Sequence, residues 1–138
     1  MSKSDPIRVL VVDDEKDFAT AIAERLARRG FRATAVFSAA EALEHLGSAP
    51  ADVVVLDLKM PGMDGLAALR KIRALHPDLE VVVLTGHGTV ASGVEGMKGG
   101  AADFLQKPVT IDVLCTAIAA AAERSRLGRL APEQEGEE

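Results

Sequence analysis

Residues 53–65 read Val53-Val54-Val55-Leu56-Asp57-Leu58-Lys59-Met60-Pro61-Gly62-Met63-Asp64-Gly65. An apolar run without polar alternation predicts a strand that is buried on both faces, which is typical of a parallel sheet. The Pro-Gly pair predicts a turn shortly after the strand. Asp57 is therefore expected at the carboxyl end of a central strand, where open α/β sheets bind their ligands.

The same order, a strand followed by a helix, recurs along the whole chain. We expect strands at residues 7–12, 31–37, 53–56, 80–84 and 103–106, and helices at 16–29, 38–47, 65–75, 89–99 and 110–127. This alternation predicts an α/β fold, in which a doubly wound parallel sheet carries helices on both faces. The helix at 89–99 is expected to be weak because Gly93 and Gly96 lie inside it. Its apolar contacts are expected from Val90, Val94 and Met97.

Length and composition exclude several classes of protein. A chain of 138 residues fits one domain, and its net charge of −5 argues against a nucleic-acid surface of its own. No apolar run has the length of a membrane span, and residues 1–6 lack the apolar core that a signal peptide is expected to have. Cys115 is the single cysteine, so the expected compartment is the cytoplasm. Residues 1–125 are expected to form the domain, and 126–138 a C-terminal extension with an acidic, disordered tail.

Polar side chains follow four of the five expected strands. They are Asp13 and Asp14, Asp57, Thr85, and Lys107. Because the carboxyl ends of parallel strands share one edge of the sheet, these side chains should converge. Neighbouring carboxylates repel one another, which a divalent cation relieves, and oxygen ligands suit Mg²⁺. A carboxylate beside Mg²⁺ and an ammonium group can attack phosphorus and hold a phosphoryl group.

These motifs resemble the receiver domain of bacterial two-component response regulators, of the single-domain, chemotaxis-receiver-like kind. The resemblance runs from about Ile7 to Arg124. It rests on the acidic pair after the first strand and on Leu-Asp-Leu-Lys-Met-Pro-Gly-Met-Asp-Gly, Leu-Thr-Gly-His-Gly and Phe-Leu-Gln-Lys-Pro. It implies a flavodoxin-like fold with five parallel strands in the order 2-1-3-4-5, five helices, and a cis bond between Lys107 and Pro108.

The resemblance also implies a role for each residue of the expected site. Asp57 would be the phosphoacceptor. Asp14, Asp57 and the backbone carbonyl of Lys59 would bind Mg²⁺ directly, and Asp13 would act through a water molecule. Lys107 would pair with Asp57 and later with the phosphoryl group.

Further residues are implied to switch the domain or to set the phosphoryl lifetime. Thr85 would be the switch hydroxyl, and Phe104 stands at the switch aromatic position, where Tyr is common in the family. Lys59 and His87 border the path of the hydrolytic water and would tune the phosphoryl lifetime. Whether His87 lines the phosphoryl pocket or only starts a helix stays open.

The function expected from this resemblance is that of a response regulator. It would take a phosphoryl group from the phosphohistidine of a sensor histidine kinase onto Asp57. It would be a signalling switch that catalyses its own phosphorylation and dephosphorylation, rather than an enzyme with a separate substrate. It would change a protein-binding face made by the fourth helix, fifth strand and fifth helix, as a monomer or as a phosphorylation-dependent dimer, with no direct contact to nucleic acid and no membrane insertion.

Two alternative functions are kept beside this one. The first is an adaptor with the same fold that takes no phosphate, against which the intact set of polar residues argues. The second is a Mg²⁺-dependent phosphatase with an aspartate nucleophile. Such enzymes often carry an acid two positions after the nucleophile, where this chain has Lys59.

Overall fold

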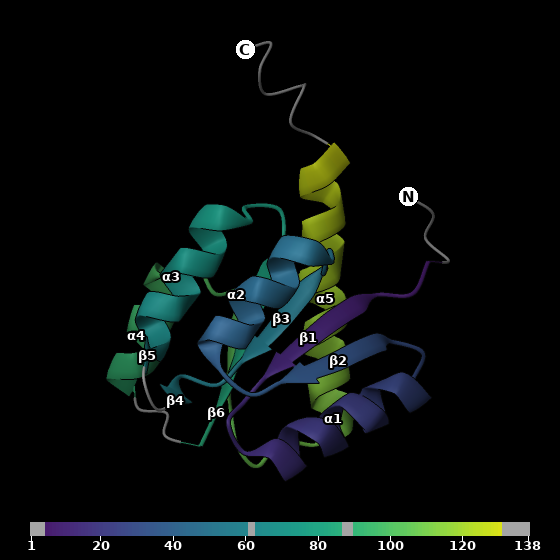
Figure 1. The fold of residues 1–138 in the computed structure, drawn as a ribbon, viewed down its shortest axis with the longest axis horizontal. Helices are drawn as coiled ribbons and strands as arrows, with labels where there is room; N and C mark the ends of the chain where they lie inside the picture. The colour runs from purple at the N-terminus through teal and green to yellow at the C-terminus, as the bar shows by residue number, and fades with distance from the viewer. Residues whose placement is uncertain (1–4, 61–62, 87–89, 131–138) are drawn as a thin grey trace.

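The computed structural model describes residues 5–60, 63–86 and 90–130 of the chain. Its main sheet is parallel and consists of β1 (Arg8–Val12), β2 (Arg32–Val36), β3 (Val53–Leu56), β6 (Glu80–Thr85) and β7 (Asp103–Gln106). The strand order β2-β1-β3-β6-β7 confirms the predicted order 2-1-3-4-5. The arrows of β1, β2 and β3 point the same way in Figure 1, so their carboxyl ends gather at one edge.

Five helices cover the two faces of this sheet. They are α1 (Lys16–Arg28), α2 (Ala39–Ser48), α3 (Gly65–Leu75), α4 (Val90–Lys98) and α5 (Ile111–Leu130). The central strands are apolar throughout because successive side chains point to opposite faces and both faces are buried. In β1, Val9 and Val11 pack against α1 and α5, whereas Leu10 and Val12 pack in the cluster that includes α2 and α3.

Local sequence signals start and end several elements. The N–H of Glu41 donates to Oγ of Ser38 at 3.1 Å, and the Glu41 carboxylate accepts from the Phe37 N–H at 2.7 Å. This reciprocal arrangement starts α2. Gly30 has a φ of 94° after α1, a conformation that favours glycine. The Lys107–Pro108 bond is cis, as the resemblance implied.

A small hairpin follows β3, where the sequence predicted only a turn. It pairs β4 (Lys59–Met60) with β5 (Met63–Asp64) in antiparallel fashion. The Asp64 carboxylate then accepts from the Leu66 N–H at 3.1 Å and caps α3. Gly65 lies directly against the backbone of Leu58, where any Cβ would overlap the Leu58 carbonyl. Gly65 is therefore a close-approach glycine that lets the hairpin fold over the start of α3.

The sequence predicted that Val94 and Met97 make the apolar contacts of α4, and this prediction is wrong. Their exposed fractions are 47% and 50%. The helix instead turns Gly93 and Gly96 towards the ring of Phe104 in β7, which a Cβ on either glycine would meet at 3.7 and 3.4 Å. The aromatic ring fills the space that larger residues on this face of α4 would need.

The last helix extends further than the sequence predicted. It continues through the expected boundary at residues 125 and 126 to Leu130 rather than ending near Leu127. The expected acidic tail at 131–138 lies outside the described residues. Among the described helices, none is long and apolar enough to cross a membrane.

Candidate functional site

The carboxyl ends of β1, β3, β6 and β7 bring the expected site residues to one edge of the sheet. Asp13 follows β1, Asp57 follows β3, Thr85 ends β6 and Lys107 follows β7. The Lys107 N–H donates to the backbone carbonyl of Thr85 at 2.9 Å, which joins the ends of β6 and β7. Residues separated by more than ninety positions thus meet at one place, as the parallel topology required.

Three carboxylates form the acidic part of this site. Oxygen atoms of Asp13, Asp14 and Asp57 lie within 4.8 Å of one another. Asp13 and Asp57 are buried, with 2% and 4% of their surface exposed, and Asp14 is more open to solvent. The loops that follow the strands orient two of them. The Glu15 N–H donates to Asp13 Oδ1 at 2.9 Å, and the Lys59 N–H donates to Asp57 Oδ1 at 3.2 Å.

The electrostatics of these carboxylates fit a hard divalent cation. Burial raises the pKa of Asp13, and the charge of Asp57 raises it further, although hydrogen bonds from Lys107 and from the Glu15 N–H oppose the shift. A cation among the three oxygens would remove this repulsion, and an all-oxygen donor set suits Mg²⁺.

Lys107 lies closest to Asp13 rather than to Asp57. Its Nζ is 2.7 Å from Asp13 Oδ2, 3.2 Å from Glu15 Oε1 and 4.0 Å from Asp57 Oδ2. Burial acts to lower the pKa of Lys107, but the hydrogen bond to Asp13 and the neighbouring carboxylates outweigh it and raise the pKa. The expected ion pair between Lys107 and Asp57 is therefore the longest of the three contacts that Nζ makes with carboxylates.

Two residues at this lysine were not expected from the sequence. Glu15 adds the second hydrogen bond, and the Phe18 ring lies 4.2 Å from Nζ, within range of a cation–π contact. Glu15 directly follows Asp13 and Asp14 in the sequence. This third consecutive acid was the one feature of the sequence that could have indicated a contact with Lys107. Phe18 shares a four-residue apolar spacing with Ile22 and Leu26 of α1, a pattern that predicts a core residue rather than a contact with Lys107.

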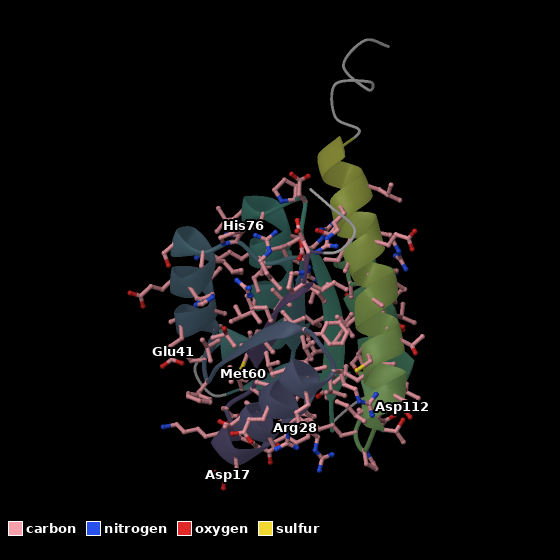
Figure 2. The ribbon with its side chains drawn as sticks, turned by 90° about the vertical axis from the view of Figure 1, so that its right-hand side faces the viewer. Asp17, Arg28, Glu41, Met60, His76 and Asp112 are labelled. Atoms are coloured by element: carbon pink, nitrogen blue, oxygen red, sulfur yellow. The ribbon has the colours of Figure 1, made fainter. Side chains whose placement is uncertain are left out.

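A cavity of about 630 Å³ opens at the site. It is lined by Asp14, Glu15, Asp57, Lys59, Met60, Gly86 and Lys107. The buried Thr85 immediately precedes Gly86. His87, which was expected near this cavity, lies outside the described residues. His76 lies at the opposite end of the molecule from Asp17 in α1 (Figure 2), so it is remote from this edge.

Residues 9–119 match the family model described as the response regulator receiver domain. The chain belongs to this family. Receiver domains of the family are phosphorylated and typically bind Mg²⁺ at an acidic pocket. The three neighbouring carboxylates and Lys107 described above therefore lie at the sheet edge of a receiver domain.

Several known proteins are similar to this receiver domain. The transcriptional regulatory protein DctD of Rhizobium meliloti, which regulates C4-dicarboxylate transport, is 42% identical over 86% of this chain and 26% of its own length. The response regulator MprA of Mycobacterium ulcerans is 35% identical over 88% of this chain and 52% of its own length. The chain thus spans a quarter to a half of these relatives. A receiver domain structure from Clostridium thermocellum has a TM-score of 0.82 at 36% identity, covering 88% of this chain and 98% of that one.

In this receiver domain, Phe104 connects β7 with α4. Its half-buried ring packs against the apolar cluster on the α2 and α3 side of the sheet and meets the glycine face of α4. The ring belongs to the strand that leads directly to Lys107. A displacement of Phe104 is therefore coupled sterically to the position of α4.

Proposed function

We propose that this receiver domain accepts a phosphoryl group on the carboxylate of Asp57 from the phosphohistidine of a sensor histidine kinase. The observation that carries the proposal is the meeting of three carboxylates and Lys107 at one edge of the sheet, where Asp14, Asp57 and Lys107 line one cavity. Phosphoryl transfer depends mainly on positioning and charge neutralisation, and this site offers both.

The proposed step breaks the P–N bond of the donor and forms a P–O bond to Asp57. The electron pair of the broken bond remains on the imidazole nitrogen of the kinase. Asp14, Asp57 and the backbone carbonyl of Lys59 would hold Mg²⁺, with Asp13 acting through water. The bound ion supplies positive charge for the phosphoryl oxygens.

Lys107 and Thr85 would respond to the new phosphoryl group. Lys107 would turn from Asp13 and Glu15 towards the phosphoryl oxygens, because charge-assisted hydrogen bonds to phosphate are strong. Thr85 would donate its hydroxyl to the same group. Lys59 lines the cavity and would restrict access of water to the phosphoryl group.

The output would be a change in the face formed by α4, β7 and α5. Val94, Met97 and Val113 are about half exposed on these helices, an apolar surface that a protein partner can cover. Phosphorylation would shift the population between two arrangements of this face, through Phe104 and α4. Partner binding or dimerisation through this face are the outputs that we propose.

Labelling with acetyl phosphate and Mg²⁺, followed by intact-mass measurement, tests the proposal. We expect one added phosphoryl group on the wild type and none on Asp57→Asn, because an amide is not a competent nucleophile. Labelling of Asp57→Asn at the wild-type rate would contradict the assignment of the acceptor. An unlabelled wild type would favour the adaptor function.

The phosphatase alternative is tested separately, by turnover of a generic phosphate ester. Lys59 stands where an acid/base carboxylate is needed in such an enzyme, so no turnover is expected. Multiple turnovers per protein molecule would favour the phosphatase over the switch.

A further inference from the structure

A second charged cluster lies at the amino-terminal edge of the sheet, opposite the acidic site. Arg8 and Arg32 are the first residues of β1 and β2 and are register partners. Arg126, in the last turns of α5, joins them. The strand arrows in Figure 1 lead away from this edge, towards the acidic site. The two sites therefore do not share residues.

The centre of this cluster is Asp52, which is completely buried. Its carboxylate accepts from the Arg8 N–H at 2.9 Å and pairs with the Arg8 guanidinium at 3.2 Å. The Arg126 guanidinium lies 3.5 Å from the same carboxylate and donates to the backbone carbonyls of Asp5 and Pro6, both at 3.2 Å. These contacts hold two guanidinium groups in fixed orientations at the surface.

The positive charge of the cluster exceeds its negative charge. A cavity of about 260 Å³ is lined by Asp5, Pro6, Arg8, Arg32 and Arg126. Three guanidinium groups stand against the carboxylates of Asp52 and the exposed Asp5. Within the described part of the chain, the Arg32 guanidinium forms no ion pair, and Nε of Arg126 is buried without an acceptor. Buried N–H donors in folded proteins are almost always hydrogen-bonded, so a water molecule or an ion is expected to accept from this Nε.

We propose that this cavity, here called the arginine cavity, binds a phosphate-type oxyanion. A guanidinium donates two parallel hydrogen bonds to such a group, and Asp52 already orients two of the three. A dianion with several acceptor oxygens can accept from more than one arginine, which favours phosphate over a carboxylate. Water occupies about 30 Å³ per molecule in the liquid, so the cavity has room for a phosphate group.

The proposal is tested by titrating the full chain with inorganic phosphate in a metal-free buffer containing a chelator, followed by ¹H–¹⁵N NMR. We expect saturable shifts of the amides of Arg8, Arg32 and Asp52. A parallel titration with glycerol 3-phosphate distinguishes two sources of the group. Tighter binding of the ester indicates a small phosphorylated molecule, and equal binding indicates free phosphate.

Matched variants separate a built site from general attraction to positive charge. Arg32→Gln removes a guanidinium that forms no ion pair with the described residues, so the fold should persist. The phosphate affinity should fall by about tenfold, the equivalent of 1.4 kcal/mol. Arg25→Gln, an exposed arginine of α1, removes the same charge elsewhere and should leave the affinity unchanged. Asp5→Asn should strengthen binding by removing a negative charge from the cavity lining.

Two results would overturn the proposal. Shifts that do not saturate, or that are confined to amides of the acidic site, would show that phosphate does not occupy the arginine cavity. Equal losses of affinity in Arg32→Gln and Arg25→Gln would indicate an adventitious ion only.

Discussion

Glu15 competes with Asp57 for the ammonium group of Lys107. Its side chain is 68% exposed and its Oε1 lies 3.2 Å from Nζ, whereas Asp57 lies at 4.0 Å. Glu15→Gln should therefore raise the rate of acetyl phosphate labelling by roughly two- to fivefold, because an exposed ion pair is worth at most about 1 kcal/mol. The same variant should change the free energy of unfolding by less than about 1 kcal/mol.

Glu24→Gln is the matched control for this prediction, since Glu24 is an exposed acid of α1, the helix that Glu15 directly precedes. It should label at the wild-type rate. A Glu15→Gln protein that labels no faster than this control would show that Glu15 does not restrain Lys107.

Gly65 has a steric role that Gly47 does not share. A Cβ at Gly65 would overlap the Leu58 backbone, whereas a Cβ at Gly47 in α2 meets nothing within 4 Å. Gly65→Ala should lower the free energy of unfolding by about 1–3 kcal/mol, as overpacking does. Gly47→Ala should raise it by up to about 1 kcal/mol through helix propensity. Urea unfolding of both variants, followed by circular dichroism, measures the difference. Equal stability of the two proteins would contradict the close approach at Leu58.

At the scale of the element, we expect α4 to be the least stable of the described helices. Two interior glycines together cost roughly 2 kcal/mol of helix preference against alanine, and Val94 and Met97 contribute little burial. We therefore expect the amides of residues 90–98 to exchange fastest among the helices, and phosphorylation to slow this exchange. Hydrogen exchange followed by mass spectrometry measures both. Protection equal to that of α1 in both states would contradict the prediction.

The glycine face of α4 can be tested directly. Gly93→Ala with Gly96→Ala should slow exchange in α4, because the added methyl groups meet the Phe104 ring at ordinary contact distances and restore helix preference. Partner binding should then depend less on phosphorylation, since α4 would move less readily. Gly47→Ala serves as the control and should leave exchange in α4 unchanged. Faster exchange in the double variant would mean that the ring cannot accommodate the methyl groups.

For the molecule as a whole, Mg²⁺ should act as a stabilising ligand. An ion that binds only the folded state adds about 2.7 kcal/mol at a hundredfold excess over its Kd, which raises the Tm of a domain of this size by roughly 10 °C. Asp14→Asn should lose most of this gain, whereas Asp17→Asn, on the first turn of α1, should keep it. Thermal unfolding followed by circular dichroism suits a chain without Trp or Tyr. An equal gain in both variants would place the ion elsewhere.

The strands, the helices and the acidic edge could be predicted because their signals are local in the chain. The apolar run before Asp57 has no alternation, and a parallel sheet follows from the repeated strand-helix order. A parallel sheet collects the residues after its strands at one edge, so Asp13, Asp57 and Lys107 could be placed together before any contact was known.

The partners of individual side chains depended on the folded chain. Glu15 and Lys107 are 92 residues apart, and Arg8 and Asp52 are 44 apart, so no local pattern indicates either contact. The inward face of α4 was mispredicted for the same reason. Hydrophobic periodicity favours Val94 and Met97, but the ring of Phe104 lies against Gly93 and Gly96, where a Cβ would already be in van der Waals contact. Packing in three dimensions overrides the periodicity of one element where a large side chain from another strand already fills the core.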